Sequence, residues 1–250
     1  MNLLLQNGGT LMKKTYLAAL CAGVIAASCA VGSASAHGVF FANRLDQKVL
    51  VLGEGPGDNA YKPSCVTAVD AYDKNFSSMN IETVTYKDHV AIMPREDLGV
   101  TVTFFDYGYF TKDKSGVMHE APFSEVADAV KTTHAIKWNV HYWNPDVTPG
   151  GIYNVPIQIV PSVNPLTLRK GDTYRIRVYK NGQPYANAPL IKDVINDLTN
   201  ESTADEDGYA TVTVSANGLN VVGVEVAGDK EDEHTTQKYF SSLSFIIDPE

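Results

Sequence analysis

The chain has few cysteines, and their positions exclude a disulfide framework. Cys21, Cys29 and Cys65 are its three cysteines, and the first two lie in an apolar N-terminal segment that we expect to be removed. Cys65 is then left without an intramolecular partner. We expect it to be a buried apolar residue, ahead of a reactive thiol or a thiolate ligand.

The chain also lacks an excess of positive charge and the motifs of common enzymes. Its formal net charge is −9, whereas nucleic-acid-binding proteins gather lysine and arginine on one face, so we expect no nucleic-acid partner. It contains no nucleophile elbow, phosphate-binding loop, dinucleotide fingerprint or His-Glu-x-x-His zinc helix. These absences argue against hydrolase and nucleotide chemistry, and the acidic balance favours cations as ligands.

The one long apolar run has the features of an export signal. Lys13 and Lys14 precede it, it extends over 17–31, and the small residues 33–36 follow it. We predict cleavage after Ala36, which leaves 214 of the 250 residues and a net charge of −11, because both lysines leave with the signal. Residues 1–11 have no signal character, which favours Met12 as the true start.

Two alternatives to this cleavage stay open at this stage. The apolar run is short for a membrane-spanning helix and ends in a cleavage motif, so we expect no transmembrane anchor in the processed protein. The stretch 26–29 loosely resembles a lipobox without its usual leucine. Lipoprotein processing at Cys29 would leave His37 inside the chain rather than at its end.

Short alternating or β-branched runs recur between turn signals, and this spacing predicts an all-β fold of antiparallel β-sandwiches. The runs are 38–42, 48–52, 66–72, 81–87, 100–105, 134–143, 173–180, 190–194, 209–214, 219–226 and 239–247. Pro156, Pro161 and Pro165 separate them into two series. We therefore predict a β-sandwich domain that carries a metal site at 37–160 and a β-sandwich domain or subdomain at 161–250.

One segment has the periodicity of a helix. After Pro122, four apolar residues fall at i, i+3, i+4 and i+7: Phe123, Val126, Ala127 and Val130. This spacing predicts a short helix or helical turn inserted between strands near 122–130.

Cleavage after Ala36 would give His37 an unusual set of donor atoms. An α-amine has an ordinary pKa of about 7.7 to 8.0, so it loses its proton readily to a competing metal, and the imidazole lies beside it. Such nitrogen donors suit nickel, cobalt, copper and zinc. The alternative is that His37 follows the cleavage site by accident.

Other histidines are candidates to complete a metal site. His134 begins a strand-like run in which alternation sends His134 and His141 to opposite faces, so the two cannot chelate one ion together. His89 follows Asp88, and His119 precedes Glu120. For each of these, a solvated or locally hydrogen-bonded side chain is the alternative. In the aromatic run 104–110, Asp106 and Tyr109 are candidate partners of a metal-bound histidine.

The order of several short motifs resembles a known family. They are Ala36-His37-Gly38, a glycine-rich turn at 53–55 that leads to 58–61, the run 105–112, and 134–139. This set is similar to a domain-of-unknown-function family of periplasmic components of ABC-type or energy-coupling-factor nickel or cobalt uptake systems. The resemblance implies a periplasmic metal-binding role beside membrane transport subunits, with His37 and His134 as ligands. It further implies that the β-sandwich domain or subdomain at 161–250 is Ig-like.

The chain departs from the family pattern in the glycine-rich turn. The family allows a histidine there, where this chain has Glu54. A carboxylate therefore either replaces imidazole as a ligand, or the turn does not contact metal. Glu54 joins His37, His134, His119 and His89 in the set of candidate metal ligands.

The sequence as a whole predicts a periplasmic protein without catalysis that captures Ni²⁺ or Co²⁺ and passes it to a membrane transporter. Cu²⁺ and Zn²⁺ are further metals that such a site would accept. Two alternatives stay open. One is a copper protein with an N-terminal histidine, either a carrier or a His-brace monooxygenase, and the other is a ligand-binding sandwich in which the histidines are incidental.

Overall fold

A computed structural model describes residues 37–55, 57–151 and 153–247, and residues 36–250 form one compact unit. The predicted signal peptide lies outside the described residues. The strands in chain order are β1 (Gly38–Arg44), β2 (Gln47–Gly53), β3 (Val66–Asp73), β4 (Ser78–Met79), β5 (Glu82–Thr85), β6 (Val90–Met93), β7 (Leu98–Asp113), β8 (Met118–His119), β9 (Ala129–Tyr142), β10 (Ile157–Pro161), β11 (Thr173–Lys180), β12 (Gln183–Pro184), β13 (Pro189–Asp193), β14 (Asp197–Thr203), β15 (Tyr209–Thr213), β16 (Gly218–Lys230) and β17 (Thr235–Ile247). Three short 3₁₀ turns accompany them, η1 (Pro63–Cys65), η2 (Phe123–Glu125) and η3 (Pro165–Thr167).

In the described part of the chain the strands form three sheets. The hairpin sheet has the order β1-β2-β6-β5, and the C-terminal sheet consists of β10, β11, β12 and β15. The central sheet has nine strands, eight of them in the order β14-β13-β16-β17-β9-β7-β3-β4, with β8 beside β7. The predicted all-β class is confirmed, and the central sheet is mixed because β17 and β9 run parallel.

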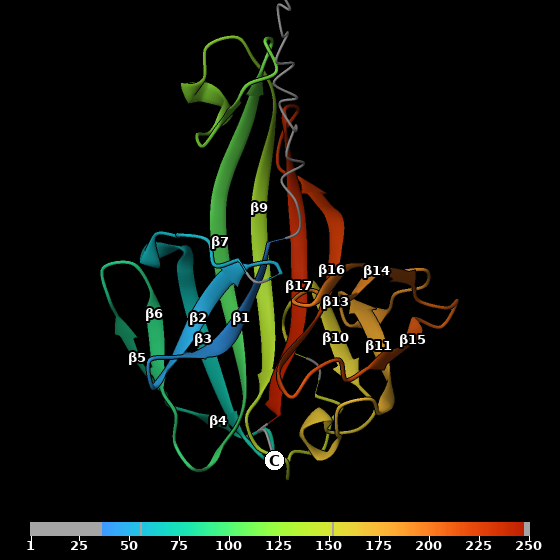
Figure 1. Ribbon diagram of the computed structural model, residues 1–250. Helices are drawn as coiled ribbons and strands as arrows, with labels where there is room; N and C mark the ends of the chain where they lie inside the picture. The colour runs from blue at the N-terminus through green and yellow to red at the C-terminus, as the bar shows by residue number, and fades with distance from the viewer. Residues whose placement is uncertain (1–36, 56, 152, 248–250) are drawn as a thin grey trace, which may run out of the picture. The chain divides into compact units, whose positions relative to one another are not determined.

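The central sheet is covered on both faces, and the side-chain alternation of β9 shows how (Figure 1). Trp138, Val140 and Tyr142 point to one face and pack with apolar residues of β10, β11 and β15. His141 points to the opposite face, where its ring meets the ring of Phe41 of β1. The hairpin sheet and the C-terminal sheet therefore pack on opposite faces of the central sheet.

The central sheet also joins the two halves of the sequence. β9 and β17 pair from Thr132 opposite Thr235 to Tyr142 opposite Phe245. The two series of strands on either side of residue 160 thus share one sheet.

The predicted short helix or helical turn near 122–130 is present only as a single turn. A single 3₁₀ turn spans Phe123–Glu125, Asp128 has a left-handed φ of 54°, and β9 begins at Ala129. Pairing of β9 with β7 explains the difference, because its backbone hydrogen bonds and buried side chains outweigh a helical periodicity of only four apolar positions.

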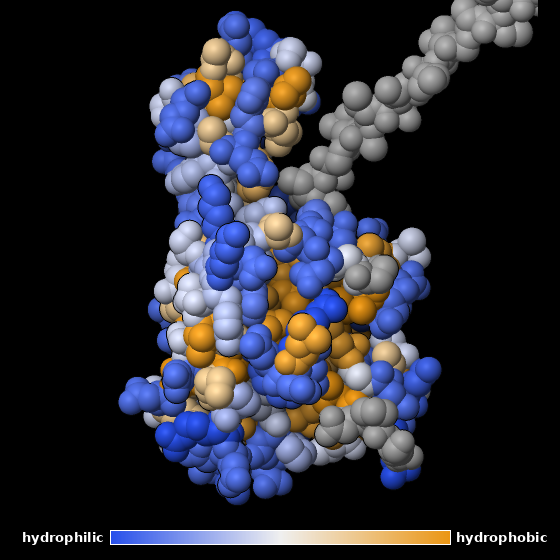
Figure 2. Space-filling view, turned by 60° about the vertical axis from the view of Figure 1, so that its left-hand side comes forward, coloured by the Kyte–Doolittle hydropathy of each residue, from blue (hydrophilic) through white to orange (hydrophobic). Residues whose placement is uncertain are grey.

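The longest strands extend beyond the layers as an arm, which we define as residues 107–136 and 227–236 (Figure 1). A hydrogen bond from Thr132 N–H to His234 O, 2.9 Å long, joins its two parts, and the ring of Phe123 stacks on that of His234. Three exposed apolar side chains, Val117, Met118 and Val130, lie near its tip. Figure 2 shows apolar patches on this projecting part and a mostly polar surface around the hollows of the body.

No helix among the described residues is long and apolar enough to span a bilayer.

Candidate metal-binding site

The β1–β2 hairpin places His37 opposite Glu54. Leu45 and Asp46 form its two-residue turn, and the strands pair in regular register up to Gly38 opposite Gly53. His37 and Glu54 are the next pair outward, and His37 Nε2 lies 3.8 Å from Glu54 Oε1. Both side chains are about a quarter exposed. Two residues that were predicted as ligands by separate arguments are therefore neighbours at an accessible edge.

Backbone contacts hold the loop that carries Glu54. The N–H of Gly55 donates to the carbonyl of Val194 at 2.8 Å, and the N–H of Asn59 donates to the carbonyl of Leu52 at 2.7 Å. Gly53 cannot be replaced without a shift, because a Cβ there would collide with the carbonyl oxygen of Gly57. The carboxylate of Glu54 therefore projects from a fixed backbone.

The start of β1 is fixed in the same way. Ser242 of β17 donates its hydroxyl proton to the carbonyl of Val39 at 2.5 Å. Gly38 lies against the ring of Phe240, so closely that a Cβ would come to 3.0 Å from it. The residue before Gly38, His37, is thus anchored to the central sheet through its neighbours.

A buried lysine lies in the same region. Lys137 of β9 is 6% exposed, and its ammonium lies 5.5 Å from the ring centroids of both Tyr107 and Phe240. Burial lowers the pKa of Lys137 to about 8, while the carboxylates of Glu225 and Glu54 act in the opposite direction.

His134 lies in a different setting, on the arm. Its Nε2 is 2.8 Å from Asp106 Oδ1, its Nδ1 is 2.5 Å from Glu231 Oε1, and its ring stacks on Tyr109 at 4.1 Å. Burial disfavours the imidazolium, but the hydrogen bonds to Glu231 and Asp106 and their charges outweigh it and raise the pKa of His134. We refer to His134, Asp106 and Glu231 as the arm clamp.

A β-bulge positions one member of the arm clamp. The register between β7 and β9 shifts at Asp106 and Gly108, and Gly108 has a φ of 92° that suits glycine. The N–H of Gly108 donates to Asp106 Oδ1 at 2.9 Å. The predicted contact of Asp106 and Tyr109 with a histidine is therefore found, and the histidine is His134.

His119 is paired with a carboxylate of its own strand pair. Its Nε2 lies 2.8 Å from Asp113 Oδ2. Asp113 also accepts from Ser115 and Val117, and these hydrogen bonds, with that of His119 the largest, hold the pKa of Asp113 well below its usual range. His119 and Asp113 thus close the β7–β8 turn.

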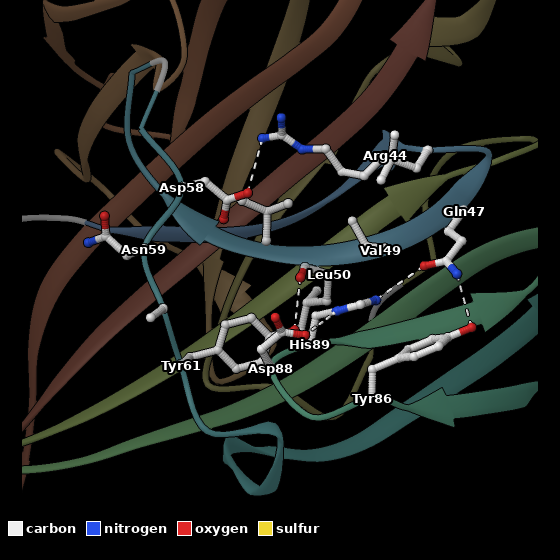
Figure 3. Close-up of a pocket in the computed structure, with 13 residues that line it drawn as sticks. Arg44, Gln47, Val49, Leu50, Asp58, Asn59, Tyr61, Tyr86, Asp88 and His89 are labelled. Atoms are coloured by element: carbon white, nitrogen blue, oxygen red, sulfur yellow. Dashed lines mark hydrogen bonds and ion pairs between the residues drawn. The ribbon is translucent and has the colours of Figure 1, made fainter.

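His89 lines a hollow of about 660 Å³ beside the hairpin sheet (Figure 3). Its Nδ1 lies 2.8 Å from Asp88, its Nε2 lies 3.1 Å from the side-chain oxygen of Gln47, and its ring stacks on Tyr86. Across the hollow, Arg44 pairs with Asp58 at 3.2 Å. These polar side chains of the hollow therefore already have partners within it.

The structure therefore brings two of the five candidate ligands together and keeps three apart. His37 and Glu54 are neighbours, whereas His89, His119 and His134 each lie beside a carboxylate of their own. Among the described residues, no group of three or more histidine, cysteine and acidic side chains is arranged to hold a metal ion. Any metal at His37 would need the terminal amine as a further donor.

Two features of this region were not identified from the sequence. Glu231 is 97 residues from His134, and nothing in the sequence pattern connects the two. In the sequence, Lys137 is only one residue of an alternating run. Its burial could not be predicted, because it depends on Phe240 of a distant strand.

The fold and the edge site define an all-β protein with sheets on both faces of a mixed central sheet and a histidine–carboxylate pair at its N-terminal hairpin. Residues 35–228 match the family described as "Domain of unknown function (DUF4198)", and the chain belongs to this family. No curated protein and no solved structure matches it.

Proposed function

We propose that this protein binds Ni²⁺ or Co²⁺ in the periplasm, without catalysis, and delivers it to the membrane subunits of an ABC-type or energy-coupling-factor uptake system. The observation that carries the proposal is the pairing of His37 with Glu54 at the end of the β1–β2 hairpin. The likeness of its sequence motifs to nickel and cobalt uptake components supports the choice of cargo and of partner.

The proposed site has three donor groups from two residues. After cleavage at Ala36, His37 would supply its α-amine and imidazole, and Glu54 would supply a carboxylate. Donor atoms bind such ions at about 2.1 Å each, so a nitrogen and an oxygen 3.8 Å apart can contact one ion. Three donors leave positions for water or for a ligand of the receiving subunit, which suits transfer.

Titration of the processed protein tests this proposal. Protein that begins at His37 is expected to bind one Ni²⁺ or Co²⁺ by isothermal titration calorimetry. His37→Ala should weaken binding by at least about a hundredfold, and Glu54→Gln by about tenfold, because each removes donor atoms. His119→Ala serves as the matched control and should bind as the wild type does. Unchanged affinity in His37→Ala would show that the proposed site is wrong.

The same titration with Cu²⁺ examines metal choice. Nitrogen and oxygen sites generally bind Cu²⁺ more tightly than Ni²⁺, Co²⁺ or Zn²⁺, so the isolated protein should prefer copper. Selection of nickel or cobalt then depends on supply and on the receiving transporter. N-terminal sequencing of the exported protein should find His37 first, and another first residue would contradict the donor set.

A further inference from the structure

Lys137 places a buried positive charge close to the proposed metal site. It pairs with Phe105 of β7 and with Phe240 of β17 across the central sheet, and the ring of Phe240 also contacts Gly38, the residue after His37. Taking an ammonium out of water costs several kcal/mol unless charges or aromatic rings compensate it. The charged form of Lys137 is therefore stable only where neighbouring groups compensate for the lost hydration.

Two aromatic rings and two carboxylates compensate Lys137. Tyr107 and Phe240 lie on either side of the ammonium, and Glu225 and Glu54 are the acidic groups that act on it. Glu225 also forms an ion pair of 2.6 Å with Lys238. The charge of Glu54 therefore acts on the buried ammonium of Lys137 as well as on any cation that binds at His37.

The positive charge of Lys137 lies near the proposed site before any metal arrives. A bound divalent ion would add two more positive charges nearby. Repulsion between charges weakens slowly with distance where protein replaces water. The ammonium thus opposes metal binding at Glu54 without touching the metal.

We infer that Lys137 is a tethered cation that lowers the metal affinity of the His37–Glu54 site and so allows the bound metal to be released. This inference rests on the proposed function. A protein that delivers its cargo needs an affinity that permits dissociation, and affinity differences between related complexes arise mostly in the dissociation rate. The buried charge of Lys137 keeps the metal affinity of the site low enough for release.

Removing the charge tests the inference. Lys137→Met keeps most of the side-chain volume, and at pH 7 it should bind Ni²⁺ about tenfold more tightly, with slower release to a chelator in stopped flow. Lys131→Met is the matched control, because Lys131 lies on the same strand but is exposed on the arm. Its affinity should stay within about twofold of the wild type, since solvent and salt screen an exposed charge.

A second variant changes the charge in the opposite direction. Glu225→Gln removes a carboxylate from the same set and should bind Ni²⁺ several-fold more weakly, a change of sign that a purely structural role would not produce. If thermal melting shows that Lys137→Met does not fold, the Glu225→Gln result decides, and unchanged affinity there overturns the inference.

The outcomes separate this inference from the proposed function. If the wild type binds Ni²⁺ through His37 but Lys137→Met binds equally or more weakly, Lys137 does not limit affinity and the proposed function stands. If binding does not depend on His37, both are wrong. Tighter binding in Lys137→Met and weaker binding in Glu225→Gln would support the inference.

Discussion

His37 and His134 both lie beside carboxylates, but their ring nitrogens are engaged differently. His37 Nε2 is 3.8 Å from Glu54, which is too long for a hydrogen bond, and the side chain is 29% exposed. His134 has carboxylate oxygens at 2.8 and 2.5 Å on its two nitrogens, and its side chain is 9% exposed. In the first arrangement the two side chains are not hydrogen bonded to each other, whereas in the second both ring nitrogens of the histidine already share protons with carboxylates.

This difference assigns the two histidines to different tasks. His134 holds the β16–β17 turn against β7 through Glu231 and Asp106, so it stabilises the arm. Cleavage after Ala36, as we propose, would place His37 at the end of the processed chain, where its side chain is 29% exposed. A histidine near acidic residues is thus a metal candidate only where its nitrogens are not already shared between carboxylates.

The largest expected effect is that of His134→Ala, which should change stability but not metal binding. It should lower the free energy of unfolding by about 2 kcal/mol, because two charge-assisted hydrogen bonds are lost in a largely buried position. Its Ni²⁺ affinity should match that of the wild type. Urea denaturation and calorimetric titration measure the two quantities, and a loss of metal binding in a folded variant would contradict the division of tasks.

A smaller effect is expected when Glu54, the neighbour of His37, is replaced by a residue with a nitrogen donor. Glu54→His should bind Ni²⁺ and Co²⁺ about tenfold more tightly, since imidazole is a better donor than carboxylate for these ions. Glu54→Gln, which binds more weakly, is its control. If Glu54→His bound less tightly than the wild type, the residue opposite His37 would not be a ligand.

The hairpin that brings His37 to Glu54 carries strain in its turn. Leu45 is almost fully exposed and has a left-handed φ of 45°, a conformation that favours glycine. Leu45→Gly should raise the free energy of unfolding by about 1 kcal/mol, with metal affinity unchanged within about twofold. Thermal denaturation measures the first effect, and a loss of stability would mean that Leu45 has packing that outweighs the strain.

The stability that the arm clamp contributes should depend on pH. The pKa of His134 is raised above its ordinary 6.5, so its contribution is complete below that pH and is lost as the pH rises through the folded value. Hydrogen bonds from His134 and Gln237 and the charge of His134 overcome burial and lower the pKa of Glu231 from its ordinary 4.5, so its contribution is complete above that pH. The stability lost in His134→Gln should therefore be greatest between about pH 4.5 and 6.5 and smaller at pH 9. A constant loss across this range would show that the clamp is not ionic.

The sequence carried enough information to predict some of these contacts. The alternating runs at 38–42 and 48–52 are separated by a short turn, and a regular hairpin between them places residue 37 opposite residue 54. The position of Asp106 and Tyr109 at the end of an aromatic run made them candidate partners of a histidine, and both contact His134. Local pairing needs only local register, and this is why both contacts were within reach.

Other contacts depend on how distant strands assemble. β17 lies parallel to β9 although about a hundred residues separate them, and this pairing brings Glu231 to His134 and Phe240 to Lys137. No turn signal fixes the register of such a pair. Of the short helix or helical turn expected near 122–130, only one 3₁₀ turn forms for a related reason, since the pairing of β9 with β7 begins at Ala129.

The central claim is that the terminal amine of His37 completes the metal site. Calorimetric titration with Ni²⁺ of two forms, one that begins at His37 and one that retains Ala36, tests it most directly, because all side chains are shared. We expect the first form to bind one ion and the second to bind at least about a hundredfold more weakly. Equal affinity in the two forms would contradict the claim.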